Sequence, residues 1–314
     1  MTQSTPTFVA VDVSKATLDV ATSCAPFAWQ ISNDSKGIAA LQRQLKCFDH
    51  PHIVCEATGR YTRQLRSGLD ASGIPISIIN PRFIRDFTRG TGKLAKTDAL
   101  DAKAILRFAQ AMNPDPTPPA RQEQQKIAEQ VRRRRQLVDM LAVEKQRMSG
   151  LDDADSIASI TAHLAFLKAE IKASDKRIAN AIAADPEATR KARLLVTIPG
   201  IAATTAAILI AELPELGSAD QKQIAALAGV APMNRDSGKW RGQAHIAGGR
   251  LSARCALYMA TVVAIRVNPA IKPFYQRLRQ NGKLPKVAIT AAMRKLVIIA
   301  NALVQQDRPW TNPA

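Results

Sequence analysis

Four acidic residues stand out by their positions in the sequence. Asp12 interrupts an apolar run, VAVDVSK, and Glu56 ends a second one, HIVCEATG. Asp98 and Asp101 lie three residues apart in KTDALDA, a spacing that places both on one face of a helix. A charge inside an apolar strand is costly unless it is paired or ligated, and four clustered acids cannot all stay ionised without a cation. If the four acids converge in the fold, they would therefore share a metal ion.

Oxygen-only ligands favour Mg²⁺ or Mn²⁺ over zinc, and two such ions could clamp the attacking and leaving oxygens of a phosphodiester exchange. The remaining ligand types argue against another metal. The four cysteines include no CxxC pair, and the four histidines do not have metal-ligand spacing. We expect reduced thiols and no zinc site.

A run of cations precedes the second acid pair. The segment 81–96, PRFIRDFTRGTGKLAK, supplies five basic side chains that are suited to holding phosphates: Arg82, Arg85, Arg89, Lys93 and Lys96. Each acid alone is more simply explained as a helix cap or a surface charge. The joint pattern of acids for metal beside bases for phosphate indicates a site that cuts nucleic acid.

Ser237 is the candidate nucleophile. It lies between Asp236 and Gly238 in a turn-prone stretch, 231–242, with the cations Arg235, Lys239 and Arg241 around it. A serine hydroxyl there would face a phosphate held by several cations, and metal assistance would make it nucleophilic. From the residues alone, an ordinary turn serine is the simpler interpretation.

Other candidates are weaker. Tyr258 is a rival nucleophile, but it sits in an apolar helical run and a packing role is expected. No Ser-His-Asp triad is supported, because nothing orients His245, the only histidine near the serine. Residues 198–201, followed by an apolar helix, are typical of a helix-hairpin-helix turn that offers backbone amides to DNA phosphate.

Alternating strands and helices must position the acids. Apolar and β-branched runs predict strands, and apolar residues at helical spacing predict helices, which together form a mixed sheet with helices against it. The predicted strands are 7–13, 17–23, 27–32, 52–56 and 76–79, and the predicted helices are 35–47, 59–72 and 97–110.

The rest of the chain is expected to be helical. Four prolines in 112–120 indicate a linker. Two heptad-like runs predict an antiparallel hairpin, with a seam of Ile127, Val131, Arg134, Val138, Leu141, Lys145 and Met148 facing Ile160, Leu164, Leu167, Ile171, Ser174 and Ile178. We predict three parts: an α/β domain (1–112), linker and hairpin (113–188), and an all-α domain (189–314).

Composition points to a polyanionic partner. The 314 residues carry a formal charge of +18, and 46% of them are hydrophobic, which predicts a packed core. From residue 189 onward there are 18 Lys and Arg against 5 Asp and Glu, so this part is the stronger candidate for phosphate binding. Aromatic residues are only 4%, which disfavours base-stacking platforms. We expect no signal peptide and no membrane span.

Several segments together resemble a known family. VDVSK, CEATGRY, INPRFIRDF and KTDALDAKAI resemble the N-terminal half of the DEDD transposases of the insertion sequence 110 family. IPGIAATTAA, LAGVAPMNRDSGKWRG and GGRLSARCALYMA resemble their C-terminal domain, and the GGR form is similar to the insertion sequence 1111 branch. The resemblance covers nearly the whole chain, in order.

The resemblance implies an RNase H-like, RuvC-type catalytic domain, a coiled-coil hairpin and a helical transposase domain. By motif match, Asp12, Glu56, Asp98 and Asp101 are the metal-binding acids, and Ser237 is the catalytic serine. With this resemblance we favour Ser237 as the nucleophile. We assign nucleic-acid binding to the five cations of 81–96 and to Arg235, Lys239, Arg241 and Arg250.

The implied activity is Mg²⁺- or Mn²⁺-dependent recombination of donor and target DNA through a phosphoserine, guided by a structured (bridge) RNA. We expect a homodimer or homotetramer with composite sites, acting at the nucleoid of a prokaryotic cytoplasm. Two alternatives stay open. One is a RuvC-like nuclease or Holliday junction resolvase that uses water, and the other is a non-catalytic nucleic-acid-binding protein.

Overall fold

The chain divides into two compact units, Met1–Ala120 and Arg121–Ala314. The computed structural model describes residues 6–24, 28–59, 61–91, 98–119, 121–234, 242 and 244–312, with residues 98–100 described by their backbone only. Each unit has its own hydrophobic core. The helical hairpin belongs to the second unit, and the division into three domains stays a prediction.

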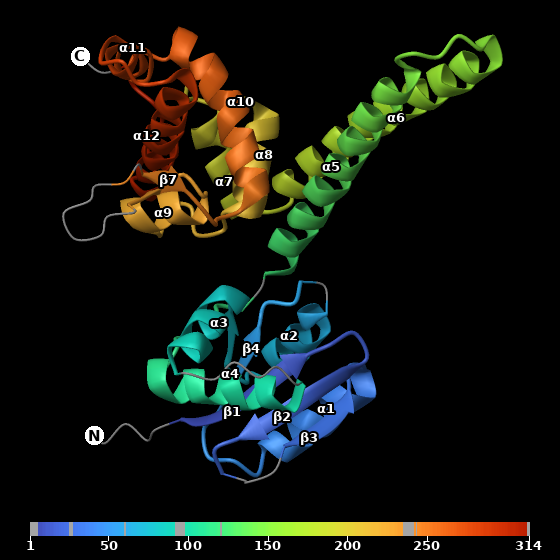
Figure 1. The fold of residues 1–314 in the computed structure, drawn as a ribbon, viewed down its shortest axis with the longest axis vertical. Helices are drawn as coiled ribbons and strands as arrows, with labels where there is room; N and C mark the ends of the chain where they lie inside the picture. The colour runs from blue at the N-terminus through green and yellow to red at the C-terminus, as the bar shows by residue number, and fades with distance from the viewer. Residues whose placement is uncertain are drawn as a thin grey trace. The chain divides into compact units, whose positions relative to one another are not determined.

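A mixed five-stranded sheet forms the centre of the first unit (Figure 1). Its strands are β1 (Thr7–Val13), β2 (Thr17–Thr22), β3 (Trp29–Ser32), β4 (Pro51–Glu56) and β5 (Ile76–Ile79), in the order β3-β2-β1-β4-β5. The first three form an antiparallel meander, whereas β4 and β5 run parallel to β1. The predicted mixed sheet is confirmed.

One face of this sheet is covered by α1 (Ser35–Leu45) and α2 (Thr62–Ala71). Val11 of β1 packs there in a cluster with Leu41 of α1 and Leu65 of α2, and all three side chains are fully buried. The side chain of Asp34 accepts a hydrogen bond from the first turn of α1, which fixes where that helix begins.

The opposite face is covered by α3 (Pro81–Gly90) and α4 (Asp98–Met112). Here Ala10 of β1 packs in a cluster with Ile84 of α3 and Ile105 of α4. Because side chains alternate along a strand, successive residues of β1 belong to different cores. Helices therefore sandwich the sheet.

The proline-rich segment after α4 is attached to the sheet. The backbone N–H of Thr117 donates to Ile76 O (2.8 Å), and its hydroxyl accepts from the N–H of Ile78 (2.9 Å). Ser77 Oγ donates to Asp115 O at 2.7 Å. Prolines prevent a regular ladder here but leave the other backbone groups able to pair. This part of the predicted linker therefore extends the first unit.

The second unit begins with a long helical hairpin, α5 (Gln122–Met148) and α6 (Ala154–Ala183). Near its base, Ile127, Val131 and Ile178 are buried, as predicted. The hairpin itself is confirmed, and its supercoiling stays a prediction.

Further along, the seam of α5 differs from the predicted heptads. Val138 and Lys145 are exposed, while Leu137 and Glu144 are buried. The seam advances by three residues twice in succession around Arg134, whose side chain lies at the edge and pairs with Asp175 (2.5 Å). This shorter step rotates the buried stripe, so that Leu137 and Glu144 take the places predicted for Val138 and Lys145, while Leu141 and Met148 remain half-buried.

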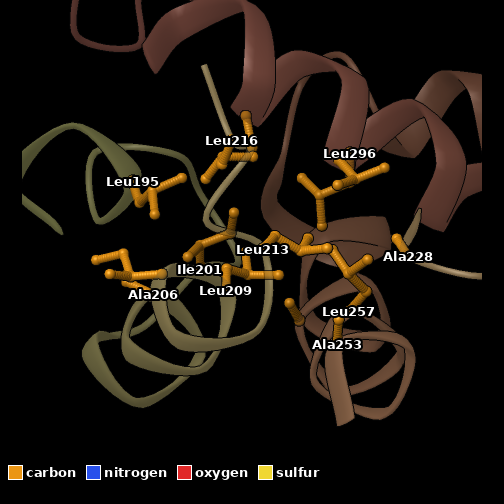
Figure 2. Packing of buried hydrophobic residues seen from close by; sticks show 14 of the residues in the cluster. Leu195, Ile201, Ala206, Leu209, Leu213, Leu216, Ala228, Ala253, Leu257 and Leu296 are labelled. Atoms are coloured by element: carbon orange, nitrogen blue, oxygen red, sulfur yellow. The ribbon is translucent and has the colours of Figure 1, made fainter. Parts of the chain in front are cut away.

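The remaining elements form one helical core. They are α7 (Pro186–Leu195), α8 (Ala203–Glu212), α9 (Gln221–Leu227), β6 (Pro232–Met233), β7 (His245–Ile246), α10 (Leu251–Val267), α11 (Lys272–Gln280) and α12 (Pro285–Gln305). Figure 2 shows Leu209 of α8, Leu257 of α10 and Leu296 of α12 gathered in this core. All three are fully buried.

One helix in the described part of the chain, α12, is long and apolar enough to cross a membrane by length and composition. Half of its most apolar window is buried, and Leu296, Val297 and Ala300 belong to the core of the second unit. We therefore interpret α12 as the central helix of a packed domain.

Candidate active site and nucleic-acid interface

Two of the predicted acids meet at the carboxyl ends of neighbouring parallel strands. The register of β1 and β4 pairs Val11 with Cys55, so the following residues, Asp12 and Glu56, are adjacent. Because side chains alternate along a strand, both acids lie on the face that carries Ala10 and is covered by α4. The register of the sheet therefore brings Asp12 and Glu56 together.

The chain turns sharply after Glu56 and is held there by two threonines. The carbonyl oxygen of Glu56 accepts hydrogen bonds from Thr58 N (3.0 Å) and from Thr62 Oγ1 (3.3 Å). The two hydroxyl groups lie 2.7 Å apart and share a hydrogen bond. These contacts fix the end of β4 and the position from which the Glu56 side chain projects.

The first turn of α4 lies toward the same end of the sheet. The residues just after α4, 115–117, hydrogen-bond to the beginning of β5, so the helix runs opposite to the parallel strands. A helix of this length spans about 22 Å, close to the length of a six-residue strand at about 20 Å. Its first turn, which contains half-buried Asp101, is therefore at the end that carries Asp12 and Glu56.

The fourth predicted acid, Asp98, begins α4, and its side chain lies outside the described residues. Within the described residues, no group of three or more His, Cys, Asp or Glu side chains is placed to share a metal ion. The structure thus brings two predicted acids together and sets Asp101 in the neighbouring helical turn. Carboxylate oxygens are the donors that a hard divalent cation prefers.

Cys55 lies beside the acid pair, in the core of the opposite face. Burial raises the pKa of its thiol to about 12, with Glu56 and Asp12 adding to the rise and Arg66 opposing it. The thiol is therefore protonated at neutral pH and cannot act as a thiolate ligand. The acids at the strand ends offer oxygen donors, and their use as metal ligands stays a prediction.

A fifth acid belongs to this row and was missed by the sequence analysis. Asp19 of β2 lies directly opposite Asp12 in the antiparallel β1–β2 register, so both side chains lie on the same face. Its Oδ1 accepts a hydrogen bond from Gln30 Nε2 at 2.8 Å. The signal was available, because a hairpin whose turn is centred between residues 15 and 16 pairs positions 12 and 19.

The predicted phosphate-binding cations begin on α3. Arg82, Arg85 and Arg89 are exposed, while Ile84 anchors the helix against the sheet. Arg82 pairs with Asp86 at 3.4 Å, an exposed contact of little energetic weight that a phosphate could replace. Lys93 and Lys96 lie outside the described residues.

The predicted nucleophile also lies outside the described residues, which omit 235–241 and thus Ser237 with Arg235, Lys239 and Arg241. The strands that bound this segment are described. β6 and β7 pair antiparallel, with Pro232 opposite Ile246 and Met233 opposite His245.

Two glycines are in close contact at the base of this strand pair. A Cβ on Gly249 would lie 2.2 Å from the backbone of Gly229, so no side chain fits there. Arg254 Nη1 bridges the same place by donating to Gly248 O (2.8 Å) and Gly229 O (3.2 Å). The N–H of Arg250 donates to Leu227 O at 2.8 Å. The two ends of the serine-bearing segment are therefore joined to each other and to α10.

The guanidinium of Arg250 is bound to an acidic side chain of the same unit. Its two terminal nitrogens bind the two carboxylate oxygens of Glu215 at 2.5 and 2.6 Å, and one of them also donates to Glu212 O (2.7 Å). Burial would raise the pKa of Glu215, but the hydrogen bonds and charge of Arg250, with Lys191 nearby, hold that pKa below its usual value. Arg250 is therefore held by Glu215, and its predicted phosphate contact stays a prediction.

Two other sequence candidates are placed by the second unit. Tyr258 is 41% exposed on α10, more open than the predicted packing role requires. The turn of residues 196–202 connects α7 and α8, and a Cβ on Gly200 would lie 2.7 Å from the Ala264 side chain. Contact of this turn with DNA stays a prediction.

The sequence matches two family models. Residues 9–152 match the DEDD transposase model of IS110 elements, and residues 192–276 match the model described as the transposase IS116/IS110/IS902 family. The first range contains all four predicted acids, and the second contains Ser237. A DEDD transposase domain implies an RNase H-like fold for the first unit, in agreement with its mixed sheet.

Similar proteins cover the chain almost end to end. The pilin gene-inverting proteins of Moraxella bovis and Moraxella lacunata are 31% and 30% identical over 317 aligned positions, which cover 97% of this chain and 97% of each relative. An uncharacterized 42 kDa protein of insertion element IS900 from Mycobacterium paratuberculosis is 29% identical over 161 positions, covering 48% of this chain and 39% of that protein.

Proposed function

Because this chain belongs to the IS116/IS110/IS902 family of transposases, which are DNA-rearranging enzymes, we propose that it cuts and rejoins DNA at specific sites through a serine-linked intermediate. The observation that carries the proposal is the β1–β4 register, which sets Asp12 beside Glu56 at the end of the sheet where α4 begins. This is a suitable frame for holding a scissile phosphate.

The carboxylates are suited to a divalent cation, in keeping with a DEDD family. Asp12, Glu56 and Asp101, with Asp98 from the start of α4, would hold Mg²⁺ or Mn²⁺. When bound, the ion would neutralise charge on the phosphate oxygens and favour the ionised form of a nearby hydroxyl. The protein's contribution is to keep the acids together on rigid strand ends.

Ser237 carries the chemistry in this proposal. Its Oγ attacks phosphorus and forms a phosphoserine ester, while the bond to the departing strand breaks and that oxygen takes a proton to become a strand-end hydroxyl. A hydroxyl of the partner DNA then attacks the phosphoserine and restores the serine. The number of phosphoester bonds is unchanged, so no ATP is needed.

The cations have two parts in this scheme. Arg82, Arg85 and Arg89 on α3, with Lys93 and Lys96, hold the backbone near the acids. Arg235, Lys239 and Arg241 neutralise the phosphate that Ser237 attacks. Cations around a transferring phosphoryl group lower the barrier because charge accumulates on its oxygens.

The acids and the serine belong to different compact units. We therefore propose a homodimer or homotetramer in which the acids of one protomer act with the serine of another. The hairpin supports this arrangement, because it exposes apolar side chains at Met140, Val143 and Phe166 that a second copy could cover. A monomer fully active in strand exchange would contradict it.

The substrate sites are chosen by a guide RNA in this proposal, which follows from the resemblance to bridge-RNA-guided transposases of the IS1111-like branch. The chain has a charge of +18 and few aromatic residues, properties suited to holding a folded RNA by its backbone. The Moraxella relatives are named for inversion of a pilin gene, which is recombination between specific sites. We place the activity on chromosomal DNA at the prokaryotic nucleoid.

A covalent-adduct assay tests the proposed function. Purified protein, the adjacent transcript, Mg²⁺ and labelled element-junction DNA are analysed on a denaturing gel. We expect an adduct with wild type that is lost in Ser237→Ala and Asp12→Asn and retained in the matched controls Ser149→Ala and Asp49→Asn, which alter an exposed serine and an exposed acid. Cleavage without an adduct, unaffected by Ser237→Ala, would instead establish a water-using, resolvase-like nuclease.

A further inference from the structure

The C-terminal helices contain a charge asymmetry that the proposed reaction does not use. Residues 251–306 contain 9 Lys and Arg and no Asp or Glu. The next acid, Asp307, is paired with Arg190 at 2.7 Å. Such an excess of one charge works against the compact state by self-repulsion, and a polyanionic partner removes that cost.

The excess is concentrated where α11 leads into α12. Lys272 and Arg279, seven residues apart, share the exposed face of α11 and stand about 10 Å apart along its axis. Lys283 lies in the following turn and Lys286 in the first turn of α12, and both are exposed. Across the part of the chain that the structure describes, none of these four cations forms an ion pair.

The base of this corner is also cationic. The Lys295 ammonium lies 4.9 Å from the centre of the Phe274 ring, and the Arg277 guanidinium lies 5.6 Å from the same ring. Lys295 Nζ donates to Ala270 O at 2.9 Å, which holds it in place. Burial and the charge of Arg277 both lower the pKa of Lys295. The ring and a carbonyl, not a carboxylate, accommodate these two cations.

The contribution of α11 to the core is small. None of its nine residues is fully buried, and Phe274 is the residue of α11 that packs against the main cluster. All three cations of α11, Lys272, Arg277 and Arg279, are exposed. The first turn of α11 and that of α12 contain no acidic residue, so no side chain there would repel a phosphate.

We propose that this α11–α12 corner, formed by Lys272, Arg277, Arg279, Lys283 and Lys286, binds the phosphate backbone of duplex DNA independently of sequence. A duplex is favoured over a single strand because the corner offers cations but no exposed aromatic face for base stacking. Contacts to phosphates carry no sequence information, so binding through these cations would be independent of sequence. The five residues of the corner are not among the positions assigned to the reaction, and the corner would anchor flanking DNA.

Equilibrium binding to a labelled duplex of arbitrary sequence tests the inference. The full-length chain is titrated by fluorescence anisotropy at several KCl concentrations in EDTA, so no cleavage occurs. The variant is Lys272→Gln, Lys283→Gln and Lys286→Gln together. The matched control is Lys36→Gln, Arg43→Gln and Lys46→Gln, which removes the same charge from exposed positions on α1 and at its C-cap, on the sheet face opposite Asp12.

We expect the triple variant to lose at least about tenfold in affinity at low salt, and its log–log salt slope to become shallower by roughly 2 to 3, as for three lost phosphate contacts. The control should keep the wild-type slope. Unchanged affinity and slope in the triple variant would overturn the inference. So would a loss confined to duplex RNA or to vesicles of anionic lipid, assayed in parallel. Ser237→Ala should bind like wild type, which separates this surface from the serine chemistry.

Discussion

Asp12 and Asp19 face each other directly across the antiparallel β1–β2 pair, on the side of the sheet that α4 covers. Like charges at opposed positions destabilise a strand pair, and a bound cation relieves the repulsion. We therefore expect Asp19→Asn to stabilise the metal-free protein by about 0.5 kcal/mol. We also expect Mg²⁺ to raise the Tm of wild type, and to raise the Tm of the variant by less.

Thermal melts followed by circular dichroism, with Mg²⁺ or with EDTA, measure both effects. The substitution is conservative because Asn retains the Oδ1 acceptor that Gln30 Nε2 uses. Equal Mg²⁺ shifts in variant and wild type would show that Asp19 does not contribute to cation binding.

Gly248 and Gly249 provide a matched pair of substitutions. Their φ angles are +66° and +67°, but a Cβ on Gly248 meets nothing within 4 Å, while one on Gly249 meets the Gly229 backbone at 2.2 Å. Gly248→Ala should cost about 1 kcal/mol for its backbone conformation alone. Gly249→Ala should cost about 2 kcal/mol more, because two backbones must separate.

Urea denaturation of the two variants measures the difference in unfolding free energy. If the base of the β6–β7 pair positions Ser237, Gly249→Ala should also reduce adduct formation at temperatures where the protein stays folded. Similar stability losses in the two variants would refute the close approach of Gly229 and Gly249.

The Arg250–Glu215 pair should contribute to stability in a pH-dependent way. The pKa of Glu215 is held below its usual value in the folded protein. Its contribution is therefore complete above the unfolded pKa of about 4.3 and is lost as the pH falls through the lower folded pKa. Glu215→Gln should reduce stability at pH 7 and flatten the stability profile below pH of about 4.5. Denaturant titrations at several pH values measure this. If the variant and wild type lost the same stability at acid pH, the pair would make no contribution.

His52 should make stability depend on pH in a higher range. Its imidazole is buried, with Nε2 2.8 Å from Ser77 Oγ, and burial lowers its pKa despite the opposing charge of Asp115. The unfolded chain then binds the proton more readily, so stability is complete above about pH 6.5 and falls as the pH drops toward the lower folded pKa. Stability should therefore be lower at pH 5.5 than at pH 7.5.

His52→Gln removes the titrating group and retains a hydrogen-bonding partner for Ser77. Chemical denaturation at the two pH values should show a smaller difference for this variant than for wild type. An equal pH dependence in both proteins would place its origin in other groups.

Local patterns in the sequence predicted the sheet well but not the contacts between distant residues. The runs 7–13 and 76–79 became strands with those bounds because continuous apolar segments have few alternatives to burial. The partner of Arg250 lies 35 positions away at Glu215, and no local pattern reveals such a pair.

Two other differences have the same kind of cause. Prolines correctly indicated irregular backbone after α4, but they gave no information on the tertiary hydrogen bonds that Thr117 makes with β5. A strict heptad predicted Val138 in the seam, whereas the ion pair of Arg134 accompanies a shorter step that buries Leu137. The proximity of Asp12 and Glu56 could be predicted because the ends of the strands that carry them could be predicted.

Successive residues of β1 pack into different cores, so the face on which Asp12 lies depends on its distance in sequence from those buried residues. Val11 and Ala10 are committed to opposite faces, so Asp12 can point toward α4 only while the number of residues between it and these anchors is unchanged. Inserting one residue between them would turn the carboxylate away without altering any charge or apolar side chain. Inserting two would restore its direction but displace it along the strand, by nearly 7 Å. The packing of β1 in the two hydrophobic cores thus determines the direction in which Asp12 projects at the end of the strand.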